Sequence, residues 1–136
     1  MSFKYSAFIE NSQEAREWLE SIGYDMRLCD NYNEYTCAGI DGVAFTTDSN
    51  YPSFRLFLKE KAISCLDNFD LFKAITAMRD DCDQNQWFTN GEYWHQCYCE
   101  NFGTFLYAEY DGDCGTDLIE SFHKATLEEL INHFKK

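Results

Sequence analysis

The sequence contains one proline and seven glycines, and it has no stretch rich in serine and glycine. Long linkers and disordered tails are rich in such residues, so we expect one continuous domain over residues 1–136. The longest apolar run is far shorter than the roughly 20 residues that a membrane-spanning helix needs. The N-terminal stretch MSFKYSAFIENS lacks the basic start and apolar core of a secretory signal. With an odd number of cysteines, seven, these absences predict a cytoplasmic protein with reduced thiols and no membrane contact.

Positive charge is also scarce, because 11 basic residues face 24 acidic ones and leave a formal net charge of -13. That charge repels phosphate backbones and anionic lipid surfaces, which argues against direct binding to nucleic acid. It is compatible with a protein that imitates DNA and occupies the basic groove of a nuclease or repressor. Most acidic proteins are acidic only for solubility, so mimicry is the minority interpretation.

Catalytic motifs are missing as well. The sequence has no Gly-rich phosphate loop, no Gly-x-Ser-x-Gly elbow, no His-Glu-x-x-His motif and no deaminase signature. A cysteine nucleophile would need one of the three histidines, His95, His123 or His133, as its base, and no spacing favours such a pair. The sequence therefore leans against an enzyme and predicts no cofactor.

A short run of metal-ligand residue types occurs late in the chain. His95, Cys97 and Cys99 alternate, so on a strand they would project from one face, and Cys114 or His123 could complete a zinc site. The run lacks the paired Cys-x-x-Cys spacing of zinc knuckles, and free cysteine is often buried simply as a small hydrophobe. We therefore assign no metal ligand, although the sequence leaves this alternative open.

The chain is organised around residues 67–97, which begin with a predicted helix. Asp67 can cap this helix, and Asp70 places negative charge near its positive N-terminal end. Apolar residues then recur at the helical period and should form one stripe that faces the core. They are Leu71, Phe72, Ile75 and Met78.

An aromatic hairpin follows, because Asn90-Gly91 favours a two-residue type I′ turn between two runs of strand-forming residues. In that register Trp87 pairs with Trp94, which places two indoles opposite each other on one face. Core packing is the ordinary interpretation of such a pair. The alternative is a surface platform that stacks a base or a side chain of a partner.

Four charged residues lie between the helix and the hairpin. Carboxylates beyond a helix C-terminus meet unpaired carbonyls and a partial negative charge, at a cost of roughly 0.3–1 kcal/mol each. The segment is then either a solvated loop or a patch offered to a cationic partner or a metal. We take these residues, with the two indoles, as the candidate binding set: Arg79, Asp80, Asp81, Asp83, Trp87 and Trp94.

The remaining elements complete an α+β fold. A helix capped by Asn11 or Ser12 should end at Gly23, and a second hairpin should turn at Asp41-Gly42. Thr126 and Glu129 form a capping box for a last helix. The predicted inward stripe of that helix comprises Leu127, Leu130, Ile131 and Phe134. Further strands are expected from Phe54 towards Leu66 and over residues 104–110. The prediction is an antiparallel sheet of hairpins and a meander, with about three helices mainly on one face.

Two segments, MRDDCDQNQWFTNGEYWHQC and the C-terminal HKATLEELINHFKK, resemble recurrent segments of small uncharacterised proteins from phages and mobile elements of gut bacteria. The resemblance covers roughly residues 67–136 and touches the end of the first helix at residues 18–24. It implies no catalytic residue. Small acidic phage proteins often bind a host factor, so the resemblance implies a binding function.

Our prediction from sequence is an accessory protein that binds a host protein, with counter-defence or DNA mimicry as its role. The alternative is a sponge that encloses a small ligand, such as a signalling nucleotide, between aromatic residues. Its phosphates would then meet arginine side chains. The candidates are Arg16, Arg27, Arg55 and Arg79. A metal-dependent or cysteine-dependent enzyme is the third alternative.

Overall fold

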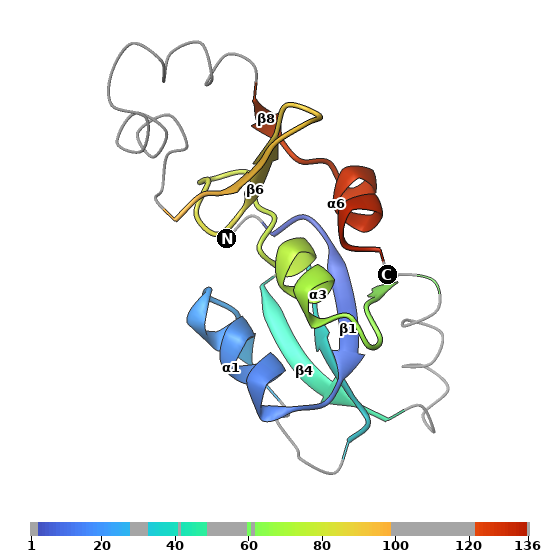
Figure 1. Ribbon diagram of the computed structural model, residues 1–136. Helices are drawn as coiled ribbons and strands as arrows, with labels where there is room; N and C mark the ends of the chain where they lie inside the picture. Colours follow the sequence, from blue (N-terminus) through green and yellow to red (C-terminus); the bar gives the residue numbers. More distant parts are fainter. Residues whose placement is uncertain are drawn as a thin grey trace.

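The computed structural model describes residues 3–27, 33–40, 42–48, 60, 62–98 and 122–135 (Figure 1). The described elements are, in chain order, β1 (Ser6–Glu10), α1 (Gln13–Ser21), β2 (Asp25–Met26), β3 (Tyr35–Ala38), β4 (Val43–Thr47), β5 (Ala62–Ser64), α3 (Phe69–Thr76), β6 (Trp87–Thr89), β7 (Trp94–Gln96), β8 (His123–Lys124) and α6 (Leu127–Phe134). The predicted α+β class is confirmed. Of the strand expected from Phe54 towards Leu66, β5 lies in the predicted region and Glu60 is helical instead, whereas residues 51–59 lie outside the described residues. The strand expected at 104–110 also lies outside them.

The larger sheet has five strands in the order β2-β4-β3-β1-β5. The predicted second hairpin is present, because β3 and β4 pair antiparallel from Tyr35 opposite Thr47 to Ala38 opposite Ala44. However, β1 runs parallel to β5 and β2 runs parallel to β4. The predicted antiparallel hairpins are thus present, but they lie in two sheets rather than one, and the larger sheet also contains two parallel pairs that were not predicted. Parallel neighbours are joined by long connections rather than by turns, and no local sequence pattern reveals such pairings.

The second sheet has three antiparallel strands in the order β7-β6-β8. Its hairpin pairs Trp87 with Gln96 and Thr89 with Trp94, so residues 90–93 form the loop and the predicted two-residue turn is wrong. Within this loop Gly91 alone has a positive φ, 96°. The side chain of Asn90 accepts hydrogen bonds from two backbone N–H groups, those of residues 92 and 93, at 3.0 and 2.8 Å. This side-chain bonding closes a longer loop.

The two indoles nevertheless share a face. The true register differs from the predicted one by two residues, which is the side-chain period of a strand. Trp87 and Trp94 are therefore diagonal neighbours, with ring centroids 6.5 Å apart and an edge-to-face arrangement.

Side-chain caps define where the helices begin. Ser12 caps α1 by accepting a hydrogen bond from the N–H of Ala15 at 3.1 Å. The cap of α3 is Asn68 and not the predicted Asp67, whose φ is +63° and whose N–H lies 3.2 Å from the Glu10 carboxylate. Helix α6 begins with the predicted capping box, in which Thr126 and its partner three residues on exchange hydrogen bonds.

Helices α1 and α3 cover one face of the five-stranded sheet, and α6 lies beside α3 next to the smaller sheet (Figure 1). The predicted stripe of α3 is buried throughout, with Phe72 and Ile75 fully inaccessible. In α6, Leu130 is buried, whereas Ile131 is 37% exposed and does not belong to the core. The apolar face of α6 is thus narrower than predicted. Within the described part of the chain, no helix has the length and apolar character needed to cross a membrane.

Candidate functional site

The charged side chains between α3 and β6 form ion pairs with other residues of the same chain. Arg79 and Asp81 form a two-pronged ion pair, with nitrogen–oxygen distances of 2.5 and 2.6 Å. These hydrogen bonds raise the pKa of the Arg79 guanidinium and lower the pKa of the Asp81 carboxyl to about 2. The charge of the guanidinium is thus already paired, and two of its nitrogens donate to a carboxylate of the same chain.

The other two carboxylates of the segment also have cations nearby. Asp80 lies 3.4 Å from Lys4 Nζ, and Asp83 lies 3.3 Å from Lys124 Nζ. In addition, α3 ends at Thr76, and the helix dipole acts mainly on charges within the last turn of a helix. These carboxylates lie beyond that turn, so the dipole has little effect on them. The helix-terminus argument made from the sequence is therefore wrong, and the carboxylates are accounted for by their ion pairs.

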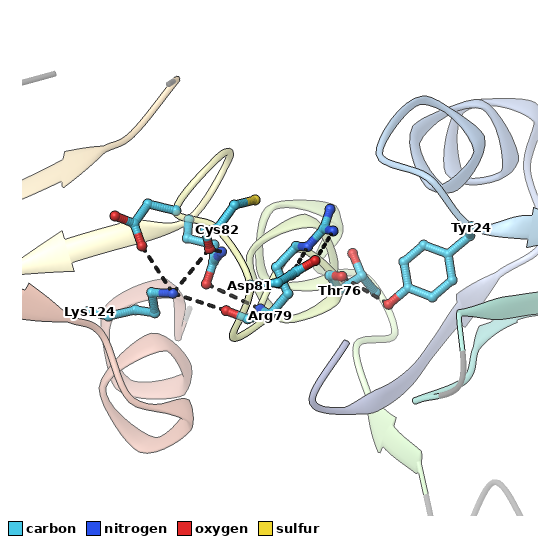
Figure 2. A network of polar contacts seen from close by, with 8 residues as sticks. Tyr24, Thr76, Arg79, Asp81, Cys82 and Lys124 are labelled. Carbon is cyan, nitrogen blue, oxygen red and sulfur yellow. Dashed lines mark hydrogen bonds and ion pairs between the residues drawn. The ribbon is translucent and has the colours of Figure 1, made fainter. Parts of the chain in front are cut away.

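A second set of contacts ties Arg79 to the core, in the region where Figure 2 shows Arg79 together with Tyr24 and Thr76. The guanidinium carbon lies 5.1 Å from the centroid of the Phe3 ring, and that ring stacks on Tyr24 at 4.0 Å. The hydroxyl group of Tyr24 donates to the backbone carbonyl of Thr76 at 2.9 Å. The segment is thus a structural junction between α3 and the smaller sheet. The buried Gln86, whose Oε1 accepts from the N–H of Arg79 at 3.2 Å, is a further part of it.

The two candidate indoles are half-buried and pack against α6. Trp94 stacks on the ring of His133, with centroids 3.9 Å apart and planes 16° from parallel. Trp87 meets Phe134 edge to face at 5.5 Å. One face of Trp94 is therefore covered, whereas Trp87 also lines an open cleft.

Of the residues considered for zinc, the described ones, His95, Cys97 and His123, do not form a metal site. Cys97 is fully buried, the ring of His95 packs edge-on against Phe122 at 5.3 Å, and His123 Nε2 lies 2.8 Å from the Glu129 carboxylate. Cys99 and Cys114 lie outside the described residues. Among the residues that are described, no group of three or more His, Cys, Asp or Glu side chains could hold a metal ion.

An aromatic cleft of about 300 Å³ lies beside Trp87. Its wall is built from four stretches of the chain, namely α1, α3, the segment around the β6–β7 pair, and α6. Four aromatic rings, two amides and two charged groups line it: Trp18, Asp70, Lys73, Asn85, Trp87, Gln96, Tyr98 and Phe134. We call this the aromatic cleft. Concave sites with apolar walls and a few convergent polar groups are typical ligand sites.

The charges of the aromatic cleft balance locally. Lys73 Nζ lies 5.8 Å from the centroid of the Trp18 ring and 5.1 Å from that of Phe69. Asp70 is one helical turn earlier, and neither it nor Lys73 enters an ion pair with another described residue. One cation and one anion are therefore available to a ligand.

Among the arginines named for phosphate binding, the described ones, Arg16, Arg27 and Arg79, do not line the aromatic cleft. Arg27 pairs with Asp25 at 3.1 Å, and Arg79 is held by Asp81. Arg16 donates to the backbone carbonyl of Ser12 at 3.2 Å, and Arg55 lies outside the described residues. The sponge hypothesis from the sequence required arginines around the phosphates of a nucleotide. The aromatic cleft instead contains one lysine, Lys73.

Much of the aromatic cleft was missed from the sequence. Trp87 was selected, but Trp18 was not, because it recurs at the helical period of a core stripe and is half-buried in that role. Its indole N–H donates to Thr76 Oγ1 at 2.9 Å. Tyr98 carried no pattern at all, and its 65% exposed side chain is recognised only from the structure.

A larger cavity of about 390 Å³ lies between the N-terminus of α3 and the C-terminal half of α6. Its wall includes the partly exposed Leu66 and Ile131 and has no aromatic residue. The amide of Asn68 in this wall is used by the helix cap and by a bond to the Phe134 carbonyl. The aromatic cleft offers more recognition chemistry, and we take it as the candidate functional site.

Comparisons of the chain with protein-family models, with curated proteins and with solved structures gave no match.

Proposed function

We propose that this protein acts by binding a small planar molecule in the aromatic cleft. The observation that carries the proposal is the convergence of Trp18, Trp87, Tyr98 and Phe134 on one cleft of about 300 Å³. These rings come from distant parts of the chain. Flat apolar walls favour a flat ligand, because stacking on each aromatic face contributes to affinity.

The charge of the protein restricts the charge of the ligand. The net charge of -13 repels polyanions at long range, and the aromatic cleft supplies Lys73 together with Asp70. A ligand with several phosphates would meet one cation, one anion and an opposing field. The preferred ligand is therefore uncharged or carries balanced charges, which differs from the phosphate-rich nucleotide considered from the sequence.

The cleft supports ligand binding better than the charged segment supports capture of a host protein. The host-protein hypothesis depended on free carboxylates at Asp80, Asp81 and Asp83. Each of them has a lysine or arginine of the same chain within 3.4 Å. Exposed charges that are already paired contribute little to a new interface.

Calorimetric titration with indole and with adenosine tests the proposal, because both are small and planar. Tyr98→Ala removes an exposed ring from the wall of the aromatic cleft. Tyr93→Ala is the matched control, since Tyr93 is 59% exposed at the hairpin loop and does not line the cleft. Loss of one stacking ring costs roughly 1–3 kcal/mol. We therefore expect Tyr98→Ala to weaken binding about tenfold or more, and Tyr93→Ala to leave it unchanged.

Two results would contradict the proposal. The first is that neither indole nor adenosine binds at low millimolar concentration. The second is equal affinity of the Tyr98→Ala and Tyr93→Ala variants, which would place the bound molecule elsewhere. A circular dichroism spectrum and a melting curve for each variant separate loss of binding from loss of fold.

A further inference from the structure

Asn85 occupies an unusual backbone position at the wall of the aromatic cleft. Its N–H donates to the carbonyl of Cys97 at 2.7 Å, and the N–H of Cys97 donates to the carbonyl of Gln86 at 2.8 Å. Two residues thus oppose one, which is a β-bulge directly before β6. Asn85 is the first residue of the bulge and has a φ of +65°. Glycine is the usual residue there, because it adopts this conformation without strain.

Asparagine is, after glycine, among the residues that adopt a positive φ most readily, so the backbone conformation fits Asn85, and its side chain is placed by the cavities that the residue lines. It lines the aromatic cleft and also a smaller cavity of about 70 Å³ beside Phe3 and Arg79. The side-chain amide makes no hydrogen bond to another described residue. Bulges often redirect a side chain next to a functional site. The bulge here places Asn85, whose side-chain amide has no hydrogen-bond partner among the described residues, in the wall of the cleft.

The other amide of the cleft is already engaged. Gln96 Nε2 donates to the backbone carbonyl of Asn85 at 3.3 Å, and Gln96 Oε1 accepts from the Tyr98 hydroxyl at 3.3 Å. These bonds hold Gln96 along the wall and brace the ring of Tyr98 beside it. Asn85 is left as the amide of the cleft that can pair with a ligand.

An asparagine amide has N–H donors and a carbonyl acceptor side by side in one plane. Its natural complement is a planar ring edge that carries an acceptor next to a donor, as a nucleobase does. Aromatic walls that stack bases while polar groups bind their edges are the usual design for recognising unpaired bases. We propose that the ligand of the aromatic cleft is a nucleobase-like heterocycle, such as a nucleoside, whose edge is bound by the side-chain amide of Asn85.

This inference rests on the proposed function and is tested with two substitutions. Asn85→Gly removes the amide and suits the positive φ, so the fold is retained. Asn85→Asp keeps the acceptor oxygen but replaces the NH₂ donor group with a second acceptor oxygen and adds a negative charge. Asn132→Asp is the control for charge, because Asn132 is exposed on α6 and does not line the aromatic cleft. The probes are adenosine, guanosine, cytidine and uridine, with indole as a planar ring that lacks a paired donor and acceptor.

We expect at least one nucleoside to bind, and its affinity to fall roughly tenfold in Asn85→Gly and in Asn85→Asp. Indole affinity should stay the same in Asn85→Gly, and Asn132→Asp should bind all probes as the unmodified protein does. If Asn85→Gly binds nucleosides normally, or if indole binds and no nucleoside does, the inference is overturned while the proposed function stands. If no probe binds, both are overturned.

Discussion

The ammonium group of Lys124 donates to the backbone carbonyl of Arg79 at 3.0 Å, although the two residues are 45 positions apart in the sequence. The same ammonium group donates to the carbonyl of Cys82 at 3.2 Å and lies 3.3 Å from a carboxylate oxygen of Asp83 (Figure 2). One side chain of β8 thus fastens the segment that joins α3 to β6. The position of Asn85 and Trp87 in the aromatic cleft depends on where this segment ends.

Lys124→Met should lower the free energy of unfolding by about 1–3 kcal/mol, because it removes charge-assisted hydrogen bonds to two carbonyls and keeps the apolar stem. Urea denaturation at neutral pH measures the change. Lys4→Met is the matched control, since its 3.4 Å pair with Asp80 is exposed and should contribute only about 0–1 kcal/mol. Equal losses in the two variants would show that Lys124 does not anchor the segment.

Asp81 should make stability depend on pH in the acid range. The hydrogen bonds from Arg79 lower the pKa of the Asp81 carboxyl to about 2 in the folded protein, below the ordinary value of 3.8. The folded state therefore binds this proton less readily than the unfolded state does. The stabilisation is complete above about pH 4 and is lost as the pH falls through about 2.

Asp81→Asn should accordingly lower the melting temperature near pH 6 and have a clearly smaller effect near pH 2, where the Asp81 carboxyl is about half protonated in the folded protein and almost fully protonated in the unfolded one. Thermal melts followed by circular dichroism at the two pH values measure this difference. Asp80→Asn changes the same charge at a site without a two-pronged pair and serves as control. A deficit of Asp81→Asn that persists unchanged in acid would contradict the assignment.

The hairpin loop offers a test of backbone strain. Gly91 has a φ of +96°, and a Cβ atom built there would meet no heavy atom within 4 Å. Gly91→Val should therefore cost roughly 1–3 kcal/mol through backbone conformation alone. Glu92→Val introduces the same side chain at the next position of the loop, where φ is not positive, and should cost less. Chemical denaturation compares the two, and equal costs would show that residue 91 does not adopt a positive φ in the folded protein.

Features decided by near neighbours in the chain were predictable from sequence. The buried stripe of α3 and the capping box of α6 each follow from residues three or four apart. The predicted turn length and register of the aromatic hairpin were wrong because of Asn90. Its side chain accepts hydrogen bonds from two backbone N–H groups, which lengthens the loop. The dipeptide Asn90-Gly91 is compatible with a two-residue loop and with the longer loop that forms, so only the structure distinguishes them.

Features decided by distant contacts were not predictable. The parallel pairing of β1 with β5 has no local pattern. The partners of Asp80 and Asp83 are lysines near opposite ends of the chain, so the carboxylates were taken for a free patch. The aromatic cleft was missed for the same reason, since the fold brings its rings together from separate elements and only Trp87 had been selected beforehand.

Cysteine reactivity provides a final test of the fold. Burial raises the pKa of the Cys37 and Cys65 thiols to about 12, and Cys97 is fully buried, whereas Cys82 is partly exposed. Because the thiolate is the reacting form, alkylation depends on both its population and its access to solvent. Brief treatment of the native protein with iodoacetamide near pH 8 should label Cys82 well before the other three. Peptide mapping by mass spectrometry measures the order.

The matched control is the same treatment in concentrated urea, where all four should react alike because their environments are lost. Thiol titration of the unfolded, unreduced protein should then count seven free groups, as the odd number of cysteines predicts. If Cys37 in the native protein reacts as fast as Cys82, the central strand β3 opens far more readily than its burial implies. The five-stranded sheet would then not be the rigid support that the aromatic cleft requires.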